Sequence, residues 1–364
     1  MSKDFLVEIG TEELPPKVLR QLSETFAAGI TQRLGEQQLS FGEMTAYAAP
    51  RRLAVLISDL AEQTPDQDVV SWGPPAKVAF GADGEPTKAA EAFARKNGLE
   101  VAALAGLVES DGQQDKLCVR QTVAGSKTTA LLGEIINQSL AGLPIPKPMR
   151  WGRSRQEFVR PVQWAVLLFG SDVVDTTIMG LTSGNLSRGH RFHSSGTIEI
   201  TAPKAYRDTL YKAFVMVDFA ERRELIRQGV IDAGKSANGH AVIDEGLLEE
   251  VTSLNEWPVP LMGRFEEHFL KVPAEALISS MAQHQKYFHV VDADNQLMPL
   301  FITVANIASR DPQQVIDGNE RVIRPRLADA AFFYNTDLNS TLEARRESLR
   351  KIVFQSQLGS VYDK

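Results

Sequence analysis

Hydrophobic positions near the start of the chain recur first at every second residue and then at every third or fourth. The alternation over residues 5–9 predicts a β-strand. Pro15 and Pro16 then open a predicted helix, because proline is tolerated in the first helical turn. Its apolar positions are Leu19, Leu22, Phe26, Ile30 and Leu34. With further strands predicted at 44–48 and 52–56, residues 1–65 form an expected β-α-β-β unit.

The next stretch is rich in turn-forming residues. The polar segment 62–68 contains Pro65 and is the expected boundary. Turns are predicted at 72–75 and 81–86, a strand at 116–123, and helices at 88–97 and 128–140. We interpret residues 66–145 as a small mixed α/β insert.

Beyond the proline-rich connector 144–148, strand and helix patterns are interspersed over residues 146–326, which predicts a larger α+β domain. Short polar residues at 292–295 are typical of a hairpin turn. The expected helices are 205–214, 219–233, 245–254 and 274–284. The expected strands are 165–169, 176–181, 197–201, 259–265, 287–291 and 300–304.

From Leu327 onward the pattern is helical only. Ser340 and Glu343 are spaced as a capping box, and an apolar stripe follows at Leu342, Leu349, Ile352 and Val353. We assign residues 327–364 to the beginning of a helical domain, and we expect the chain to be truncated because Lys364 interrupts the pattern. The predicted fold class is therefore α+β and multidomain.

The net charge of −7 makes the chain as a whole unlike a polycationic nucleic-acid binder, so any RNA contact must come from local basic patches. Cys118 is the single cysteine, which excludes an intrachain disulfide. No apolar run approaches the roughly 20 residues of a membrane-spanning helix. Together with the polar start of the chain, these features lead us to expect a cytoplasmic protein.

The densest basic cluster lies between residues 147 and 160. Guanidinium groups bind phosphates bidentately and aromatic faces stack on unpaired bases, so this mixture suits contact with RNA or a partner. The alternative is a solvated edge beside a core tryptophan. The cluster contains Lys147, Arg150, Arg153, Arg155 and Arg160, interleaved with Trp151, Phe158 and Trp164.

Three shorter basic segments are further candidates. Arg188 and Arg191 belong to a segment in which His190 and His193 have a spacing that could hold a metal, but without a third ligand a structural or RNA-facing turn is the better interpretation. Arg51 and Arg52 precede a strand, so only one of them should reach a given surface. For this pair, ion pairing with Glu8, Glu12 or Glu13 and phosphate binding remain equal alternatives.

The third segment surrounds Pro325, which we expect to begin a new helix that buries Leu327, Ala331 and Tyr334. An inter-domain or inter-subunit ion-pair network is the first interpretation of its charges, and RNA contact is the second. The charged residues are Arg321, Arg324, Arg326 and Asp329. No residue is assigned a catalytic or metal-binding role, and His284 is interpreted as a packing or capping residue.

Four segments carry a family resemblance. They are 8–16 (EIGTEELPP), 250–258 (EVTSLNEWP), 281–288 (MAQHQKYF) and 319–327 (NERVIRPRL), and the last residues, 357–364 (QLGSVYDK), fit the same pattern. Together they closely resemble the bacterial glycyl-tRNA synthetase beta subunit, over essentially the whole chain. None of the segments is a catalytic signature.

The resemblance implies an RNA-binding and assembly subunit. In that family a separate alpha subunit carries the aminoacylation core, with ATP and Mg expected there and no cofactor in this chain. The implied partners are the alpha subunit and tRNA-Gly, with beta–beta contact allowed and neither membrane nor DNA involved. The resemblance also implies a B3/B4-like module at 146–326 and an HD-type helical domain from 327. Hydrolytic editing of mischarged tRNA and a purely structural scaffold are the alternatives.

Overall fold

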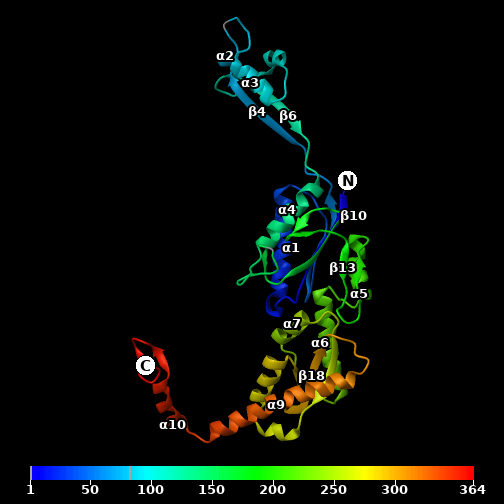
Figure 1. The fold of residues 1–364 in the computed structure, drawn as a ribbon, viewed down its shortest axis with the longest axis vertical. Coiled ribbons are helices and arrows are strands. Elements are labelled where there is room, and N and C mark those ends of the chain that lie inside the picture. The colour runs from blue at the N-terminus through cyan, green and yellow to red at the C-terminus, as the bar shows by residue number, and fades with distance from the viewer. Residues whose placement is uncertain (1, 82, 154) are drawn as a thin grey trace.

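The computed structural model describes residues 2–81, 83–153 and 155–364 and shows an elongated molecule (Figure 1). A central body lies between a small apical body and a lower body, and a C-terminal arm extends from the lower body. Helices and several antiparallel sheets are mixed throughout, which confirms the predicted α+β class. Among the described residues, no helix is both long and apolar enough to cross a membrane.

The central body is built on a five-stranded antiparallel sheet in the order β10-β9-β1-β3-β2. One face is covered by α1 (Leu19–Glu36) and α4 (Thr128–Ala141), and the other by α5 (Tyr206–Lys212). The predicted apolar positions of α1 are all buried, which confirms its inward face. The strands are β1 (Ser2–Thr11), β2 (Met44–Ala49), β3 (Arg52–Ala61), β9 (Val162–Phe169) and β10 (Asp172–Val173).

This sheet crosses the divisions that the hydrophobic pattern suggests. β9 follows the expected division at residue 146, yet it pairs with β1 along seven residue positions. α4 lies in the expected insert, yet Leu132 and Ile136 pack in the same core as Phe26 of α1. Periodicity shows that an element has a buried face but does not identify the element that covers it.

The apical body is a three-stranded sheet in the order β4-β6-β5, with α3 (Lys88–Lys96) on one face. Its strands are β4 (Gln67–Pro75), β5 (Val108–Ser110) and β6 (Asp115–Val123), and its shorter helices are α2 (Ala76–Ala79) and η2 (Val101–Leu107). The turn predicted at 72–75 is wrong, because these residues end β4. Proline is tolerated there since β4 is an edge strand.

The lower body contains a four-stranded antiparallel sheet in the order β15-β17-β18-β16. The predicted hairpin between β17 and β18 is confirmed, and Asp292 Oδ1 accepts hydrogen bonds from the backbone of Asp294 and Gln296. The strands are β15 (His240–Ala241), β16 (Val259–Arg264), β17 (Phe288–Val291) and β18 (Leu297–Ala305). The helices are α6 (Phe219–Ser236), α7 (Glu245–Leu254), η4 (Glu267–Lys271), α8 (Ala274–Ser279) and the π-helical η5 (Ser280–Gln285).

Short hairpins decorate the central body. The strand predicted at 176–181 is instead two short strands, because Met179 and Gly180 adopt positive φ and reverse the chain. The hairpin strands are β7 (Met149–Arg150), β8 (Glu157–Phe158), β11 (Thr177–Ile178), β12 (Leu181–Thr182), β13 (Leu186–Arg188) and β14 (Thr197–Glu199). Two 3₁₀ turns are η1 (Pro16–Val18) and η3 (Pro203–Ala205).

The C-terminal region differs most from expectation. α9 (Pro312–Leu338) runs through Pro325, so the helix start expected there is wrong. The buried face was predicted correctly: Leu327 is buried, and Ala331 and Tyr334 pack against the same cluster. Pro325 itself is exposed, and its missing N–H leaves a carbonyl group that water can satisfy.

The end of the chain is not purely helical. α10 (Leu342–Arg346) and η6 (Glu347–Lys351) are followed by a hairpin of β19 (Val353–Gln355) and β20 (Gly359–Ser360). The capping residue is Thr341 rather than Ser340, since the Thr341 hydroxyl accepts from the Ala344 N–H at 3.2 Å. The expected apolar stripe is not packed, and Leu342 is 88% exposed.

A buried ion-pair cluster joins the central and lower bodies. Arg52 is fully buried and lies between two carboxylates, 3.6 Å from Glu8 Oε2 and 3.3 Å from Glu256 Oε1. Arg51 binds the other oxygen of Glu256 at 2.7 Å. Glu8 also accepts hydrogen bonds from Trp164 Nε1 and from the Ser187 hydroxyl. Each buried charge therefore has a partner, which is the condition under which a protein interior tolerates it.

Arg222 also links the central and lower bodies, but it does so through backbone carbonyl groups rather than through carboxylates. Its fully buried guanidinium donates to the backbone carbonyls of Ala48, Met216 and Thr252, which belong to β2, the α5–α6 connection and α7. Burial lowers the pKa of Arg222 to about 10, so the side chain stays charged at neutral pH. One side chain thus fixes three backbone segments.

We predict that Glu256→Gln lowers the free energy of unfolding by about 3–5 kcal/mol, because the two buried guanidinium groups of Arg51 and Arg52 are then left with a single carboxylate, Glu8. The same chemical change at the exposed Asp172, which pairs with Lys3 at 3.2 Å, should cost less than about 1 kcal/mol. Urea denaturation of both variants measures the difference. Equal effects at the two sites would contradict a special role for the buried cluster.

The contribution of Glu256 should also depend on pH. Burial raises the pKa of the Glu256 carboxyl, but Arg52 and Arg51 outweigh it, and the net shift is below the ordinary value of 4.5. A depressed folded-state pKa stabilises the protein above that value, and the stabilisation disappears as pH falls through the folded-state pKa. The stability difference between wild type and Glu256→Gln should therefore shrink below about pH 4.5. A difference that is constant down to pH 3 would contradict this.

A substitution at Gly10 can test how tightly Trp164 packs beneath the buried ion-pair cluster. A Cβ atom at this position would lie 1.8 Å from Trp164 Cε2, so Gly10→Ala should displace the indole that binds Glu8 and destabilise the protein by about 3 kcal/mol or more. Gly35, in α1, has no atom within 4 Å of the same added group. Gly35→Ala should therefore be neutral or stabilising by up to about 1 kcal/mol. Thermal unfolding of the two variants provides the comparison.

Candidate nucleic-acid interface

The basic cluster between residues 147 and 160 forms a hairpin, β7 with β8, on the central body. It contains five cationic side chains and one carboxylate, a net charge of +4 on a chain whose net charge is −7. Arg150 is paired with Glu157 at 3.1 Å. Within the described part of the chain, Lys147, Arg153 and Arg155 are exposed and make neither an ion pair nor a hydrogen bond. Three cations are therefore available to an external anion.

The aromatic residues of this cluster anchor the hairpin rather than cover its outer surface. Phe158 is 1% exposed and Trp164 is 8% exposed, so neither presents an open face to a base. Trp151 is partly buried against the central core. The alternative of a core tryptophan thus holds for Trp164, while the four arginines of the 147–160 cluster remain at the surface.

A second basic segment lies beside the hairpin. Arg160 Nε donates to the Glu13 carbonyl at 3.0 Å, and Arg191 pairs with the carboxylates of both Glu12 and Glu13 at 3.1 Å. Residues that are distant in sequence thus converge on one acidic pair. The structure brings Arg160 and Arg191 together, which the sequence alone did not predict.

Arg191 belongs to the turn between β13 and β14, residues 189–196, which is held by His190. The Nδ1 atom of His190 accepts from the N–H groups of Phe192 and His193, at 3.2 and 3.3 Å. Its Nε2 atom lies 2.8 Å from the Asn306 carbonyl, so this nitrogen carries the proton. Burial lowers the pKa of His190, consistent with a neutral ring at pH 7. The turn is therefore rigid at its base.

The two histidines have structural partners. His193 Nε2 accepts from the Ala308 N–H at 2.9 Å. Among the residues that the structure describes, no group of three or more histidine, cysteine or acidic side chains is arranged to hold a metal ion. The histidines therefore hold the turn in place, whichever surface the turn faces.

A pocket of about 330 Å³ opens beside the turn. The Arg188 guanidinium lies over the Trp164 ring, 5.1 Å from its centroid. In the described residues Arg188 has no hydrogen bond or ion pair, so its N–H groups remain free. The other lining residues are mostly polar and include Thr11, Glu12, Gln163 and Ser194.

Arg51 and Arg52 do not contribute free cations to this surface. Both are internal members of the ion-pair cluster, and Arg52 is 0% exposed, so it has no surface for a phosphate. The ion-pair alternative therefore holds, with Glu8 as a predicted partner and Glu256 as one that was missed. The expectation that the two point to opposite faces is wrong, because Arg51 lies in the turn before β3 and both reach Glu256.

The charged residues of α9 lie in the lower body, away from the hairpin (Figure 1). Arg324 pairs with Glu266. Among described residues, Arg321, Arg326 and Asp329 are exposed without an ion pair or hydrogen bond of their side chains, so the expected network is here a single pair.

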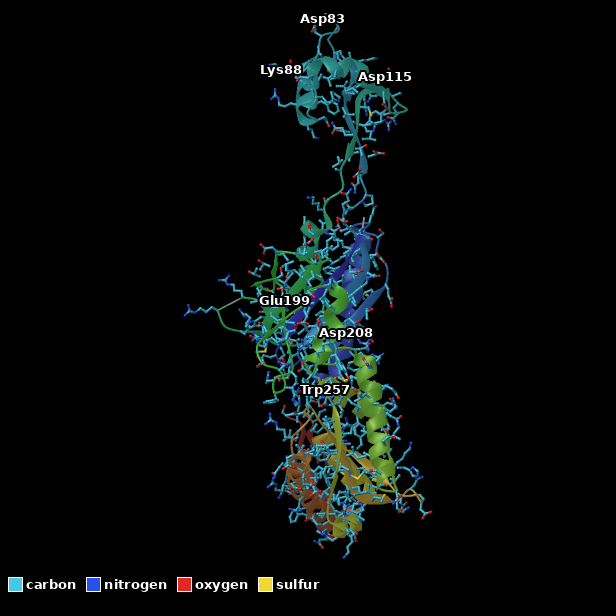
Figure 2. All side chains as sticks on the ribbon, turned by 90° about the vertical axis from the view of Figure 1, so that its right-hand side faces the viewer. Asp83, Lys88, Asp115, Glu199, Asp208 and Trp257 are labelled. Carbon is cyan, nitrogen blue, oxygen red and sulfur yellow. The ribbon has the colours of Figure 1, made fainter. Side chains whose placement is uncertain are left out.

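The four recognisable segments meet one another inside the fold. Glu8 and Glu256 share Arg52, as described above. Glu250 pairs with Lys286 at 3.0 Å, and the Tyr287 hydroxyl donates to Asn319 Oδ1 at 2.6 Å. Trp257 lies at the junction of the central and lower bodies (Figure 2). The first of these contacts connects the central and lower bodies, and the other two hold the lower body together.

Sequence reasoning overlooked Phe192. Its side chain is 76% exposed although it lies between Arg191 and His193. The available signal was an aromatic residue within a basic, glycine-containing turn, the same combination that singled out residues 147–160.

Comparison with known proteins agrees with the resemblance noted in the sequence. The family model described as glycyl-tRNA synthetase beta subunit matches residues 5–364. The glycine–tRNA ligase beta subunit of Hahella chejuensis is 61% identical over 363 residues, which cover 100% of this chain and 52% of that protein. The corresponding subunit of Marinobacter nauticus is 55% identical over 365 residues, with the same two coverages.

A third relative, the glycine–tRNA ligase beta subunit of Stutzerimonas stutzeri, is 52% identical over 361 residues, or 99% of this chain and 52% of that protein. The chain thus spans about half the length of the curated relatives it matches. Because the family model covers nearly every residue, the chain belongs to the glycyl-tRNA synthetase beta subunit family.

Proposed function

We propose that this chain is a non-catalytic, tRNA-binding and assembly part of a heteromeric glycine–tRNA ligase. In this proposal the alpha subunit binds ATP and Mg and attaches glycine to tRNA-Gly, in the cytoplasm and within a heterotetramer. The names of the relatives support membership of a glycine–tRNA ligase. The beta-subunit name also implies an alpha partner.

The observation that carries the tRNA-binding role is the hairpin of residues 147–160. Its net charge of +4 stands out against an acidic protein, and Lys147, Arg153 and Arg155 are free to bind phosphate. Phosphate contacts position a nucleic acid without reading its sequence. The proposed contribution to aminoacylation is therefore orientation: the tRNA is held so that its acceptor end reaches the partner's active site.

Hydrolytic editing is the second candidate, and the polar pocket beside Trp164 is the observation that favours it. His190 is adjacent in sequence to two residues of the pocket wall, but both of its ring nitrogens are engaged by backbone groups. It is therefore not available as a general base in this arrangement. The positional role is the better supported of the two.

We predict that Arg153→Ala combined with Arg155→Ala weakens tRNA binding to this chain and lowers the slope of log affinity against log salt by about 1.5–2, because two phosphate contacts are lost. Binding is measured by fluorescence anisotropy of labelled tRNA-Gly over a series of salt concentrations.

The matched control is Arg95→Ala combined with Lys96→Ala, which removes the same charge from exposed positions on the apical helix α3. This control should change the slope by less than half as much. If both double variants behave alike, the hairpin has no specific role. If neither changes the affinity, the scaffold interpretation replaces the tRNA-binding one.

A further inference from the structure

The Phe192 side chain is exposed even though hydrogen bonds hold the backbone that carries it. The side chain is 76% exposed, but the backbone beneath it is fixed. The Phe192 N–H donates to His190 Nδ1 at 3.2 Å, and the Ser194 N–H donates to the His190 carbonyl at 3.0 Å. The His190 N–H in turn donates to the Ala213 carbonyl at 3.0 Å. A fixed turn that presents a phenyl ring to solvent is already organised to bind a flat apolar surface.

Close packing within the turn supports the same view. A Cβ atom at Gly189 would lie 2.5 Å from Ser194 Cβ, so the two ends of the turn are pressed together. Arg51 Nη2 donates to the Gly189 carbonyl at 2.8 Å, which ties the turn to the buried ion-pair cluster. The ring of Phe192 therefore projects from a backbone that is held on both sides.

The charges around the ring select the occupant. Arg188, on the strand that leads into the turn, makes no hydrogen bond or ion pair among the described residues, and Arg191, next to the ring in sequence, pairs with Glu12 and Glu13. An exposed aromatic ring and an arginine with free N–H groups on one hairpin suit a ligand that combines flat faces with negative charge. Nucleobases linked by phosphates have this combination, and stacking on an aromatic side chain is a common way to bind them.

We propose that Arg188 and the turn 189–196 form a binding site for an unpaired nucleotide of RNA, with the base stacked on Phe192 and a neighbouring phosphate bound by Arg188. The inference rests on the proposed tRNA-binding function and specifies the part of the RNA that this surface accepts. A base within a duplex has both faces covered by its neighbours. A stacking side chain therefore requires a single-stranded loop, bulge or end.

The experiment measures binding of the 364-residue chain to two labelled probes, a short single-stranded oligoribonucleotide and a blunt RNA duplex of the same length. Phe192→Ala should weaken binding of the single strand roughly tenfold and leave binding of the duplex within about twofold. Phe192→Tyr keeps an aromatic ring and should bind as wild type does. Phe332→Ala removes a ring of similar exposure, 65%, from α9 and should have no effect.

A second variant, Arg188→Gln, tests the proposed phosphate contact. It should lower the salt dependence of single-strand binding by about one phosphate contact. Circular dichroism and thermal unfolding of each variant show whether the fold is retained.

Three outcomes would overturn the proposal. Equal loss for single strand and duplex would indicate a general contact without stacking. Unchanged RNA binding by Phe192→Ala, with weaker association with the alpha subunit, would assign the ring to a protein interface and leave the hairpin's role intact. Failure of the wild-type chain to bind either probe would remove this inference together with the tRNA-binding function, whereas loss limited to Phe192→Ala supports both.

Discussion

The structure depends on the buried pairing of Glu8 and Glu256 with Arg51 and Arg52. Removing four charged groups from water is costly, and the cost is offset only if each group keeps a close partner of opposite charge. Arg52 meets that condition by contacting both carboxylates at once. Because Glu8 comes from β1 and Glu256 from the segment after α7, the pairing also requires the central and lower bodies to be correctly placed.

The same ion-pair cluster also holds the hairpin of β13 and β14 in place. Arg51 holds the Gly189 carbonyl and Arg52 lies within hydrogen-bonding distance of the Ser187 hydroxyl, at 2.8 and 3.2 Å. The strand and turn that carry Arg188, Arg191 and Phe192 are therefore fixed from below. The proposed orienting role requires such support, because a loosely held side chain loses the advantage of a fixed position.

Charge is divided between regions of the molecule. The chain is acidic overall, yet the hairpin 147–160 is strongly basic, and Arg188 of β13 is exposed with no ion pair among the described residues. Such a distribution restricts an anionic polymer to one region, since it is repelled elsewhere. The recognisable sequence segments contact one another: Lys286 pairs with Glu250, and the Tyr287 hydroxyl donates to Asn319. These two pairs hold the lower body together, whereas Glu8 and Glu256, through Arg52, join it to the central body.

The sequence by itself determined the α+β class, the family, the inward face of α1, helix α7 and the hairpin turn at 292–295. These features follow from local periodicity, turn residues and motif content, all of which act over a few neighbouring residues. It also identified Arg153 and Arg155 as surface cations within a basic cluster. Helix interruption at Pro325 was predicted wrongly, because packing of Ile323 and Leu327 on the core outweighed the local preference.

Tertiary structure alone decided how distant segments pair. It placed β9 against β1, set Glu256 beside Arg51 and Arg52, and joined Arg160 to Arg191 through Glu12 and Glu13. These contacts link residues more than a hundred positions apart, and neither partner's local pattern specifies the other. Whether an arginine is a buried ion-pair member or a free surface cation is settled by that pairing, which is why Arg52 and Arg188 looked alike in the sequence and differ in the fold.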